Sequence, residues 1–302
     1  MFGQRYNRLT LREGIAKIVP LMMACAAVSL ACSDEPTGPT GDGVFGEWLR
    51  SGGDVRTYEL RLPSSYDGSE PAPLLLAFHG NPDDAVHFEA RTGLTPVADE
   101  AGFITVYPDG LGGTWGPWDN QLALDLIEVM SDSLSIDPER IYIAGYSAGG
   151  TRTQIIACKH SDVFSAAAVV GATLELAVYV DCPLRHPIST LFVHGTEDQA
   201  FPWGGLTSGS RRRLSVDETL ELWTDLSECM GMPVVDTLPD RVDDGTRVWR
   251  ELWTDCDGDS EVMFFGVEGG GHTWPSGPGP FPPGRITQEI SSEEILEFLA
   301  IH

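Results

Sequence analysis

Short apolar runs alternate along the chain with segments whose apolar residues recur at helical spacing. Continuous apolar runs are typical of strands buried on both faces. Such runs occur at 73–78, 103–107, 141–144, 164–171 and 190–193. Residues 55–62 alternate between polar and apolar, which predicts a half-exposed early strand, and two late strands are predicted at 247–254 and 261–267.

Helices are predicted between these strands. Residues 122–134 carry apolar side chains at helical spacing, and residues 95–102 have the pattern of a helix end. Capping boxes, formed by Ser215 with Glu218 and by Ser291 with Glu294, predict helices over 216–229 and 293–301. Strands that alternate with helices predict a three-layer α/β fold with a mostly parallel central sheet.

The strand predicted at 141–144 leads into Gly145-Tyr-Ser-Ala-Gly149, after a turn expected at Asp137-Pro138-Glu139. This is the G-x-S-x-G pattern of a nucleophile elbow, in which Ser147 sits on a sharp strand-to-helix turn. The two glycines allow the neighbouring strand and helix to approach closely. A glycine-rich turn that happens to carry a serine is the alternative interpretation.

The strand at 73–78 ends in His79-Gly80-Asn81. Esterases with such an elbow place an oxyanion-binding loop after this strand. We therefore expect the backbone N–H groups of Ala148 and of Asn81 or Gly80 to bind the oxyanion. A plain glycine turn is the alternative for residues 79–81.

Three predicted strands end near unusual polar residues: Ser147, Asp198 and His272. Functional residues of open α/β sheets gather at the carboxyl ends of strands. The order Ser, Asp, His along the chain is that of α/β-hydrolases. In this interpretation Ser147 is the nucleophile, His272 its base, and Asp198 orients the imidazole.

Other residues compete for these roles. Glu197 adjoins Asp198 and is an alternative acid, while Asp109 ends a strand that precedes the nucleophile. His79 and His194 also end strands, but both precede Asp198, which is the wrong order for the base.

Aromatic residues near these motifs are candidates for substrate binding. The loop 112–118 is rich in glycine and carries Trp115 and Trp118, whose rings could stack on a ring-bearing or sugar-like substrate. The alternative is that both rings cover the edge of the core. We count Tyr146, Trp203 and Trp274 among the substrate-binding candidates as well.

The N-terminal residues 1–32 have the pattern of an export segment. Four basic residues precede an apolar run, 18–31, that is too short for a comfortable membrane span. The run ends at Cys32 in a pattern that resembles a bacterial lipobox, which predicts lipidation of this cysteine; an ordinary signal peptidase site is the alternative. Residues 33–43 then read as a flexible Pro/Gly tether, and 44–302 as one catalytic domain.

The net charge of −26 argues against nucleic acid or an anionic membrane surface as a partner. It fits a solvated acidic surface that keeps an exported, monomeric protein soluble, with a lipid anchor as its only membrane contact. We therefore expect an extracellular or cell-envelope location. Four cysteines remain after the export segment, which predicts two disulfides among Cys158, Cys182, Cys229 and Cys256, with three pairings open and free thiols as the alternative.

No cysteine or histidine spacing typical of zinc occurs, and the acidic stretch 255–259 lacks the glycine position of a calcium loop. We therefore expect neither a metal nor a cofactor.

Together these motifs resemble the secreted α/β-hydrolase esterases known as polyhydroxybutyrate depolymerase-like, which include bacterial and fungal feruloyl and acetylxylan esterases. The resembling pieces are 76–80, 107–110 with Trp115, 145–150, 194–198 with 202–203, and the Gly-Gly-Gly-His-Thr-Trp-Pro stretch 269–275. The resemblance covers about residue 44 to the C-terminus. It implies the same triad and a disulfide between Cys229 and Cys256. The sequence departs from the family at Asn81-Pro82 and at Asp119-Asn120.

The expected function is that of an exported serine carboxylester hydrolase without a cofactor. Its substrates would be feruloyl or acetyl esters of plant polysaccharides, or hydroxyalkanoate polyesters. A serine peptidase of the prolyl oligopeptidase kind shares the fold and the triad, although no propeller domain is present. A non-catalytic surface-anchored binding protein is the alternative outside the enzymes.

Overall fold

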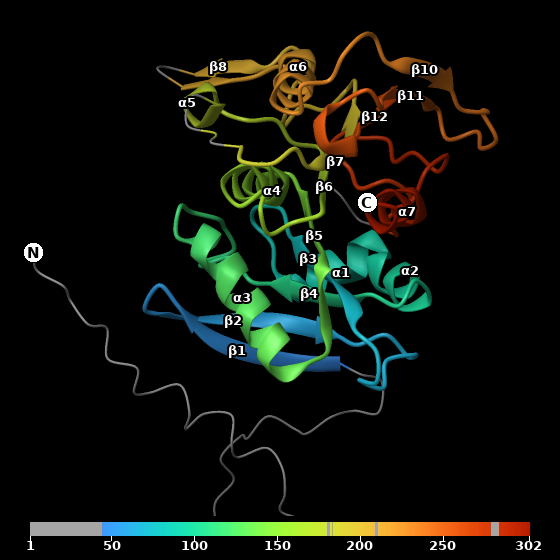
Figure 1. Ribbon diagram of the computed structural model, residues 1–302. Coiled ribbons are helices and arrows are strands. Elements are labelled where there is room, and N and C mark those ends of the chain that lie inside the picture. Colours follow the sequence, from blue (N-terminus) through green and yellow to red (C-terminus); the bar gives the residue numbers. More distant parts are fainter. Residues whose placement is uncertain (1–43, 180–181, 183, 209–210, 279–283) are drawn as a thin grey trace, which may run out of the picture. The chain divides into compact units, whose positions relative to one another are not determined.

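The computed structural model describes residues 44–179, 182, 184–208, 211–278 and 284–302 (Figure 1). The predicted export segment and tether, with Cys32, lie outside the described residues. Within the described part of the chain, no helix combines the length and the apolar character needed to cross a membrane.

A ten-stranded sheet with the order β1-β2-β4-β3-β5-β6-β7-β12-β11-β10 forms the centre of the fold. From β4 to β12 neighbouring strands are parallel, and antiparallel strands flank this part on both sides. The strands of the sheet are β1 Val44–Ser51, β2 Asp54–Arg61, β3 Ala72–Phe78, β4 Ile104–Pro108, β5 Ile136–Tyr146, β6 Ala166–Val170, β7 Ser189–Gly195, β10 Val234–Thr237, β11 Arg247–Trp253 and β12 Val262–Glu268. A separate hairpin pairs β8 Leu206–Ser208 with β9 Arg211–Arg213.

Helices cover both faces of this sheet. They are α1 Ala85–Thr92, α2 Leu94–Glu100, α3 Asp119–Ser133, α4 Ala148–Lys159, α5 Leu176–Tyr179, α6 Val216–Leu226 and α7 Ser292–Ala300. Helices α3, α4 and α6 contribute to one buried apolar cluster, and α1, α2 and α7 contribute to another. In Figure 1 these two sets flank the strands on opposite sides.

The strands show why two cores form. Successive side chains of a strand point to opposite faces, so Leu74 and Leu76 of β3 enter the first cluster while Leu75 and Ala77 enter the second. All residues of β3 are buried, as the continuous apolar run predicts. The predicted three-layer α/β fold with a mostly parallel sheet is confirmed.

Most element boundaries differ from the prediction by up to three residues, and two of the differences concern β5 and α6. Strand β5 begins at Ile136, so the predicted turn at Asp137–Glu139 is the exposed start of the strand, paired to β3 only at Ala72. Helix α6 ends at Leu226 rather than 229. Both predicted capping boxes are present. The sequence patterns did not reveal β1, α1, α5, the β8–β9 hairpin or β10.

Two disulfides join neighbouring cysteines, Cys158 to Cys182 and Cys229 to Cys256. The first connects helix α4 to the segment after α5, and the second connects the end of α6 to the turn before β12. The prediction of two disulfides is confirmed, and the structure selects one of the three pairings.

Candidate active site

Ser147 stands on a strained turn between β5 and α4. Its backbone has φ 56° and ψ −122°, a region that non-glycine residues rarely occupy. A Cβ on Gly145 would collide with the backbone of Gly149, and a Cβ on Gly149 would collide with the carbonyl oxygens of Phe78 and His79. Both glycines are therefore required for the turn, and the predicted elbow geometry is present.

Three strands bring the predicted triad residues to one edge of the sheet. Ser147 follows β5, Asp198 follows β7, and His272 follows β12. His272 Nε2 lies 2.8 Å from Ser147 Oγ, and His272 Nδ1 lies 2.7 Å from Asp198 Oδ2. Because a carboxylate only accepts, Nδ1 carries the proton and Nε2 is free to accept the serine proton. All three side chains are buried.

The loop after β7 fixes the orientation of the Asp198 carboxylate. Oδ1 accepts hydrogen bonds from the backbone N–H groups of Ala200 and Phe201, both at 2.8 Å, which leaves Oδ2 for His272. His194 Nε2 donates to the Phe201 carbonyl at 2.8 Å and lies 3.5 Å from Asp198 Oδ2. Burial lowers the pKa of His194, so the ring is neutral and braces the loop.

The competing residues lie elsewhere. Glu197 is an exposed side chain that pairs with Arg285 at 3.3 Å. Asp109 accepts from Thr57 and from the Ala85 N–H on the β2 side of the sheet.

The remaining competitor, His79, is bonded within the oxyanion loop. His79 Nδ1 donates to the Gly80 carbonyl, and Nε2 accepts from the Gly110 N–H at 2.9 Å. Burial lowers the pKa of this imidazole, which accords with a neutral ring that shapes the loop.

The predicted oxyanion loop lies against the serine. A Cβ on Gly80 would stand 3.4 Å from Ser147 Cβ and 3.1 Å from the Tyr146 ring. Ala148 is the first residue of α4, so its N–H belongs to the unpaired donors at the helix start. The Asn81 side chain donates to Thr114 Oγ1 at 2.9 Å, which ties the loop to the neighbouring turn. The structure thus brings Gly80 against Ser147, while Ala148 follows Ser147 directly in the chain at the start of α4.

The predicted substrate-binding aromatics have different environments. Trp274 is fully buried and its Nε1 donates to Ser292 Oγ on α7, so this prediction is wrong: the ring lies in the core between the sheet and α7. Tyr146 is also buried; its ring packs against the His272 imidazole and its hydroxyl donates to the His272 carbonyl. That placement makes it a support for the imidazole.

Three tryptophans remain in different degrees of exposure. Trp115 is half-buried against Phe78 and donates from Nε1 to the His79 carbonyl at 2.8 Å. Trp203 is half-buried and packs near Trp249. Trp118 is 51% exposed, so among these three it is the ring most available for stacking.

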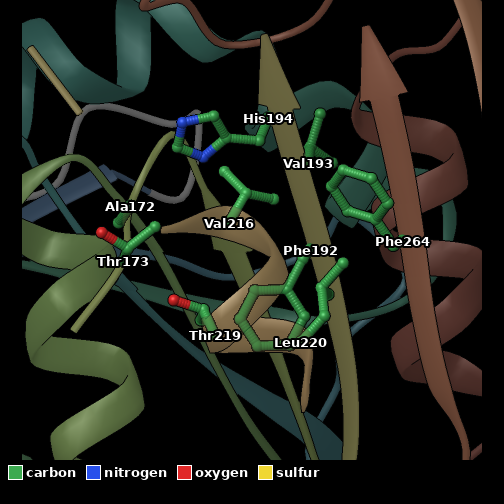
Figure 2. A pocket seen from close by; sticks show the side chains of 9 residues that line it. All are labelled: Ala172, Thr173, Phe192, Val193, His194, Val216, Thr219, Leu220 and Phe264. Atoms are coloured by element: carbon green, nitrogen blue, oxygen red, sulfur yellow. The ribbon is translucent and has the colours of Figure 1, made fainter. Parts of the chain in front are cut away.

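A small cavity lies beside His194 (Figure 2). Its volume is about 10 Å³, which suits a single water and not a substrate. The figure shows a mostly apolar lining, with His194 and the hydroxyls of Thr173 and Thr219 as its polar groups. None of the three predicted triad residues lines this cavity.

One group of three side chains in the described residues has a metal-like spacing: Asp83, Asp84 and His87. Asp83 pairs with Arg91 at 3.0 Å, and Asp84 caps α1 and pairs with His87. Both carboxylates thus have partners within the protein.

Sequence patterns did not reveal Phe201. Its ring is parallel to the His272 imidazole, with an angle of 6° between the planes and 5.5 Å between the centroids. No local motif marks a phenylalanine three residues after the acid as a neighbour of a histidine 71 positions later. Only the packing of the two loops shows it.

Fold and site geometry together define an α/β-hydrolase. A sequence profile of the prolyl oligopeptidase family matches residues 94–186, which contain the elbow. The solved structure of an acetyl xylan esterase from Aspergillus awamori is similar over 82% of this chain and 94% of that chain, with a TM-score of 0.58 and 14% identity.

Curated relatives define the family more closely. A putative esterase NocK from Nocardia uniformis subsp. tsuyamanensis is 27% identical over 82% of this chain and 80% of its own length. A probable feruloyl esterase C from Aspergillus terreus is 30% identical over 61% of this chain and 67% of its own length. Feruloyl esterase B from Piromyces equi is 27% identical over 70% of this chain, which spans 42% of that relative. The chain belongs to the α/β-hydrolase esterase family that includes feruloyl esterases, acetylxylan esterases and poly(3-hydroxyalkanoate) depolymerases.

Proposed function

We propose that this protein is a serine carboxylester hydrolase that works through an acyl-enzyme. The observation that carries the proposal is the hydrogen-bonded series Asp198–His272–Ser147 at a strained elbow. The two hydrogen bonds, 2.7 Å from Asp198 to His272 and 2.8 Å from His272 to Ser147, join an orienting acid, a base and a nucleophile.

The chemistry follows from this arrangement. Ser147 Oγ attacks the ester carbonyl while its proton moves to His272 Nε2, and the imidazolium is stabilised by Asp198. The N–H groups of Ala148 and of the loop at Gly80–Asn81 bind the oxyanion, each donor contributing about 3 kcal/mol to the transition state. His272 then protonates the leaving alcohol, and a water activated by the same imidazole hydrolyses the acyl-enzyme.

The substrates we propose are feruloyl or acetyl esters of plant polysaccharides, or hydroxyalkanoate polyesters. The names of the relatives, which include a feruloyl esterase, a bifunctional acetylxylan esterase/xylanase and a poly(3-hydroxyalkanoate) depolymerase, support this range. Trp118, more exposed than Trp115 and Trp203, is the ring that we assign to stacking on the substrate.

We further propose that the protein is exported, anchored through Cys32. Two disulfides support an oxidising compartment. The mass of the mature N-terminal peptide tests the anchor: a diacylglyceryl cysteine at residue 32 is expected, and an unmodified N-terminus at another residue contradicts it.

A peptidase is the second candidate, favoured by the match to the prolyl oligopeptidase profile. One panel separates the two functions: p-nitrophenyl acetate, p-nitrophenyl butyrate, methyl ferulate, acetylated xylan, a hydroxybutyrate oligomer and a Gly-Pro p-nitroanilide. We expect ester hydrolysis, lost on the order of 10⁶-fold in kcat in Ser147→Ala.

The matched control is Ser133→Ala, because Ser133 is exposed at the end of α3. This variant should keep wild-type rates. Cleavage of the anilide alone would assign the protein to the peptidases, and inactivity on every member of the panel would refute both enzyme functions.

A further inference from the structure

A guanidinium lies one aromatic ring away from the proposed catalytic base. Arg213, the last residue of β9, has its Cζ atom 3.8 Å from the centroid of the Phe201 ring. Phe201 is in turn parallel to the His272 imidazole. The series Arg213–Phe201–His272 therefore places a positive charge next to the loop that carries both Phe201 and Asp198.

The backbone also links this arginine to the imidazole. Gly171 lies against His272: a Cβ there would be 3.2 Å from Nδ1. Four residues further along the chain, Glu175 forms a β-bridge with Arg213, and the Leu214 N–H donates to the Leu174 carbonyl at 2.8 Å. The segment 171–175 thus connects the surroundings of the imidazole with those of Arg213.

Arg213 has no acceptor for its N–H groups in the described part of the chain. The side chain is half-buried, and its Nη1 is shielded from solvent without a hydrogen-bond partner. Stacking on Phe201 uses the flat face of the guanidinium. Because Nη1 is closed off from solvent, the donors left for a ligand are Nε and Nη2, which have no partner in the described residues. Burial lowers the pKa of Arg213, while Glu175 and Asp198 raise it from beyond ion-pair distance. A shielded, unpaired cation is costly in a folded protein.

Arg213 differs in this respect from the other buried or half-buried arginines, which have side-chain partners. The chain has 45 acidic against 19 basic residues, so carboxylates are abundant. Buried or half-buried arginines pair with them: Arg56 with Asp119, Arg61 with Glu89, Arg91 with Asp83, Arg140 with Asp137 and Arg250 with Asp236. Arg152 bonds to Asn120 instead. Even Arg212, the exposed neighbour of Arg213, forms an ion pair with Glu218.

We propose that Arg213 binds a carboxylate carried by the ester substrate. The proposal rests on the proposed esterase function and names the substrate class: esters with one free carboxylate, either on the acyl side or on the alcohol side. A guanidinium matches a carboxylate with two parallel hydrogen bonds. Because the protein as a whole is strongly acidic, an anionic substrate requires such a local cation to bind near the serine.

The test compares carboxylate-bearing esters with neutral esters of similar size. Mono-p-nitrophenyl succinate against p-nitrophenyl butyrate probes the acyl side, and 4-acetoxybenzoate against phenyl acetate probes the alcohol side. The readout is the ratio of kcat/KM within each pair, in which any general loss of activity cancels.

In Arg213→Met we expect this ratio to fall about 10- to 100-fold for one pair, chiefly through KM, as for loss of hydrogen bonds to a charged group. The pair that responds identifies the side of the carboxylate. Arg213→Lys should retain part of the ratio, and the matched control Arg212→Met should keep it, since Arg212 is paired at the surface. A ratio in Arg213→Met equal to that of the wild type for both pairs overturns the proposal.

A binding measurement separates this inference from the esterase proposal. Titration of Ser147→Ala with monomethyl succinate and with 4-acetoxybenzoate requires no turnover. A Kd that rises about 10-fold or more for either compound when Arg213→Met is added supports carboxylate recognition even if the wild type hydrolyses no ester. Equal affinity of both compounds for the single and double variants overturns it, whatever the outcome of the hydrolysis panel.

Discussion

Replacement of Asp198 by asparagine is the sharpest test of the proposed triad. In the native loop Oδ1 accepts two backbone N–H groups, from Ala200 and Phe201. An asparagine must keep its carbonyl oxygen at that position, because its amide group cannot accept those bonds. Its NH₂ group then faces His272 Nδ1 as a donor. The imidazole is forced into the tautomer with the proton on Nε2, which cannot accept a proton from Ser147.

The expected loss follows from that tautomer. A carboxylate-to-amide change that leaves the geometry of such a triad intact lowers kcat about 10⁴-fold. We expect a loss of this order with p-nitrophenyl butyrate at pH 7.5 and little change in KM, since Asp198 is fully shielded from the substrate. A circular dichroism spectrum and a thermal melt identify any variant that is simply unfolded.

Glu197→Gln is the matched control for this prediction. Glu197 is the neighbouring carboxylate, exposed and paired with Arg285 at the surface, where an ion pair contributes about 0–1 kcal/mol. Its kcat should stay within about twofold of the wild type. If Asp198→Asn folds and keeps more than a tenth of the wild-type kcat, or if Glu197→Gln loses as much as Asp198→Asn, the reasoning is refuted.

Three further changes test the support of the site. Gly149→Ala should unfold the protein or lower its free energy of unfolding by about 3 kcal/mol or more, because the added methyl group collides with the backbone at the end of β3. The control is Gly204→Ala, whose methyl group meets open space, and thermal melts of the two variants give the comparison. Replacing Cys229 and Cys256 by serine should cost about 3 kcal/mol by denaturant titration, as expected for a loop of 27 residues; an unchanged midpoint contradicts this. Burial lowers the pKa of His79 in the folded state, so as the pH falls the unfolded chain takes up this proton first. The contribution of His79 to the free energy of unfolding is therefore complete above about pH 6.5 and is lost at lower pH. Denaturant titrations between pH 7 and pH 5 should show a less steep fall in stability for His79→Gln than for the wild type.

The sequence carried enough information for the layers and the proposed triad. Continuous apolar runs such as β3 require cover on both faces, and the glycines of the elbow require a specific turn. Chain order then selected Asp198 over Asp109 and His272 over His194. An apolar run has burial on both faces as its cause, and the elbow glycines have a close backbone approach as theirs, so each pattern indicates one structural feature.

Elements without such a cause escaped prediction. Helix α1 is short and buries only Ala85, Phe88 and Thr92, so its periodicity is weak. Strand β10 is exposed throughout, at the edge of the sheet, and has no buried face to show as alternation. The prediction that Trp274 binds substrate was wrong for a related reason. A tryptophan two residues from His272 looks like part of the site, but its partner is Ser292 on α7, which no local pattern connects to it.

Arg213 shows the same limit at the level of chemistry. Successive residues of a strand point to opposite sides, so Arg212 reaches Glu218 of α6 while Arg213 reaches Phe201. Whether an arginine finds a carboxylate depends on which loops arrive at its side of the strand. Here the loop after β7 brings Phe201 and Asp198, and the Asp198 carboxylate is already bonded to His272 and to two backbone N–H groups. Glu175, across the β-bridge, forms no ion pair with Arg213 in the described residues. The hydrogen bonds that orient the proposed triad therefore keep the Asp198 carboxylate from pairing with Arg213, so part of the reason for the unpaired guanidinium lies in how the site is built.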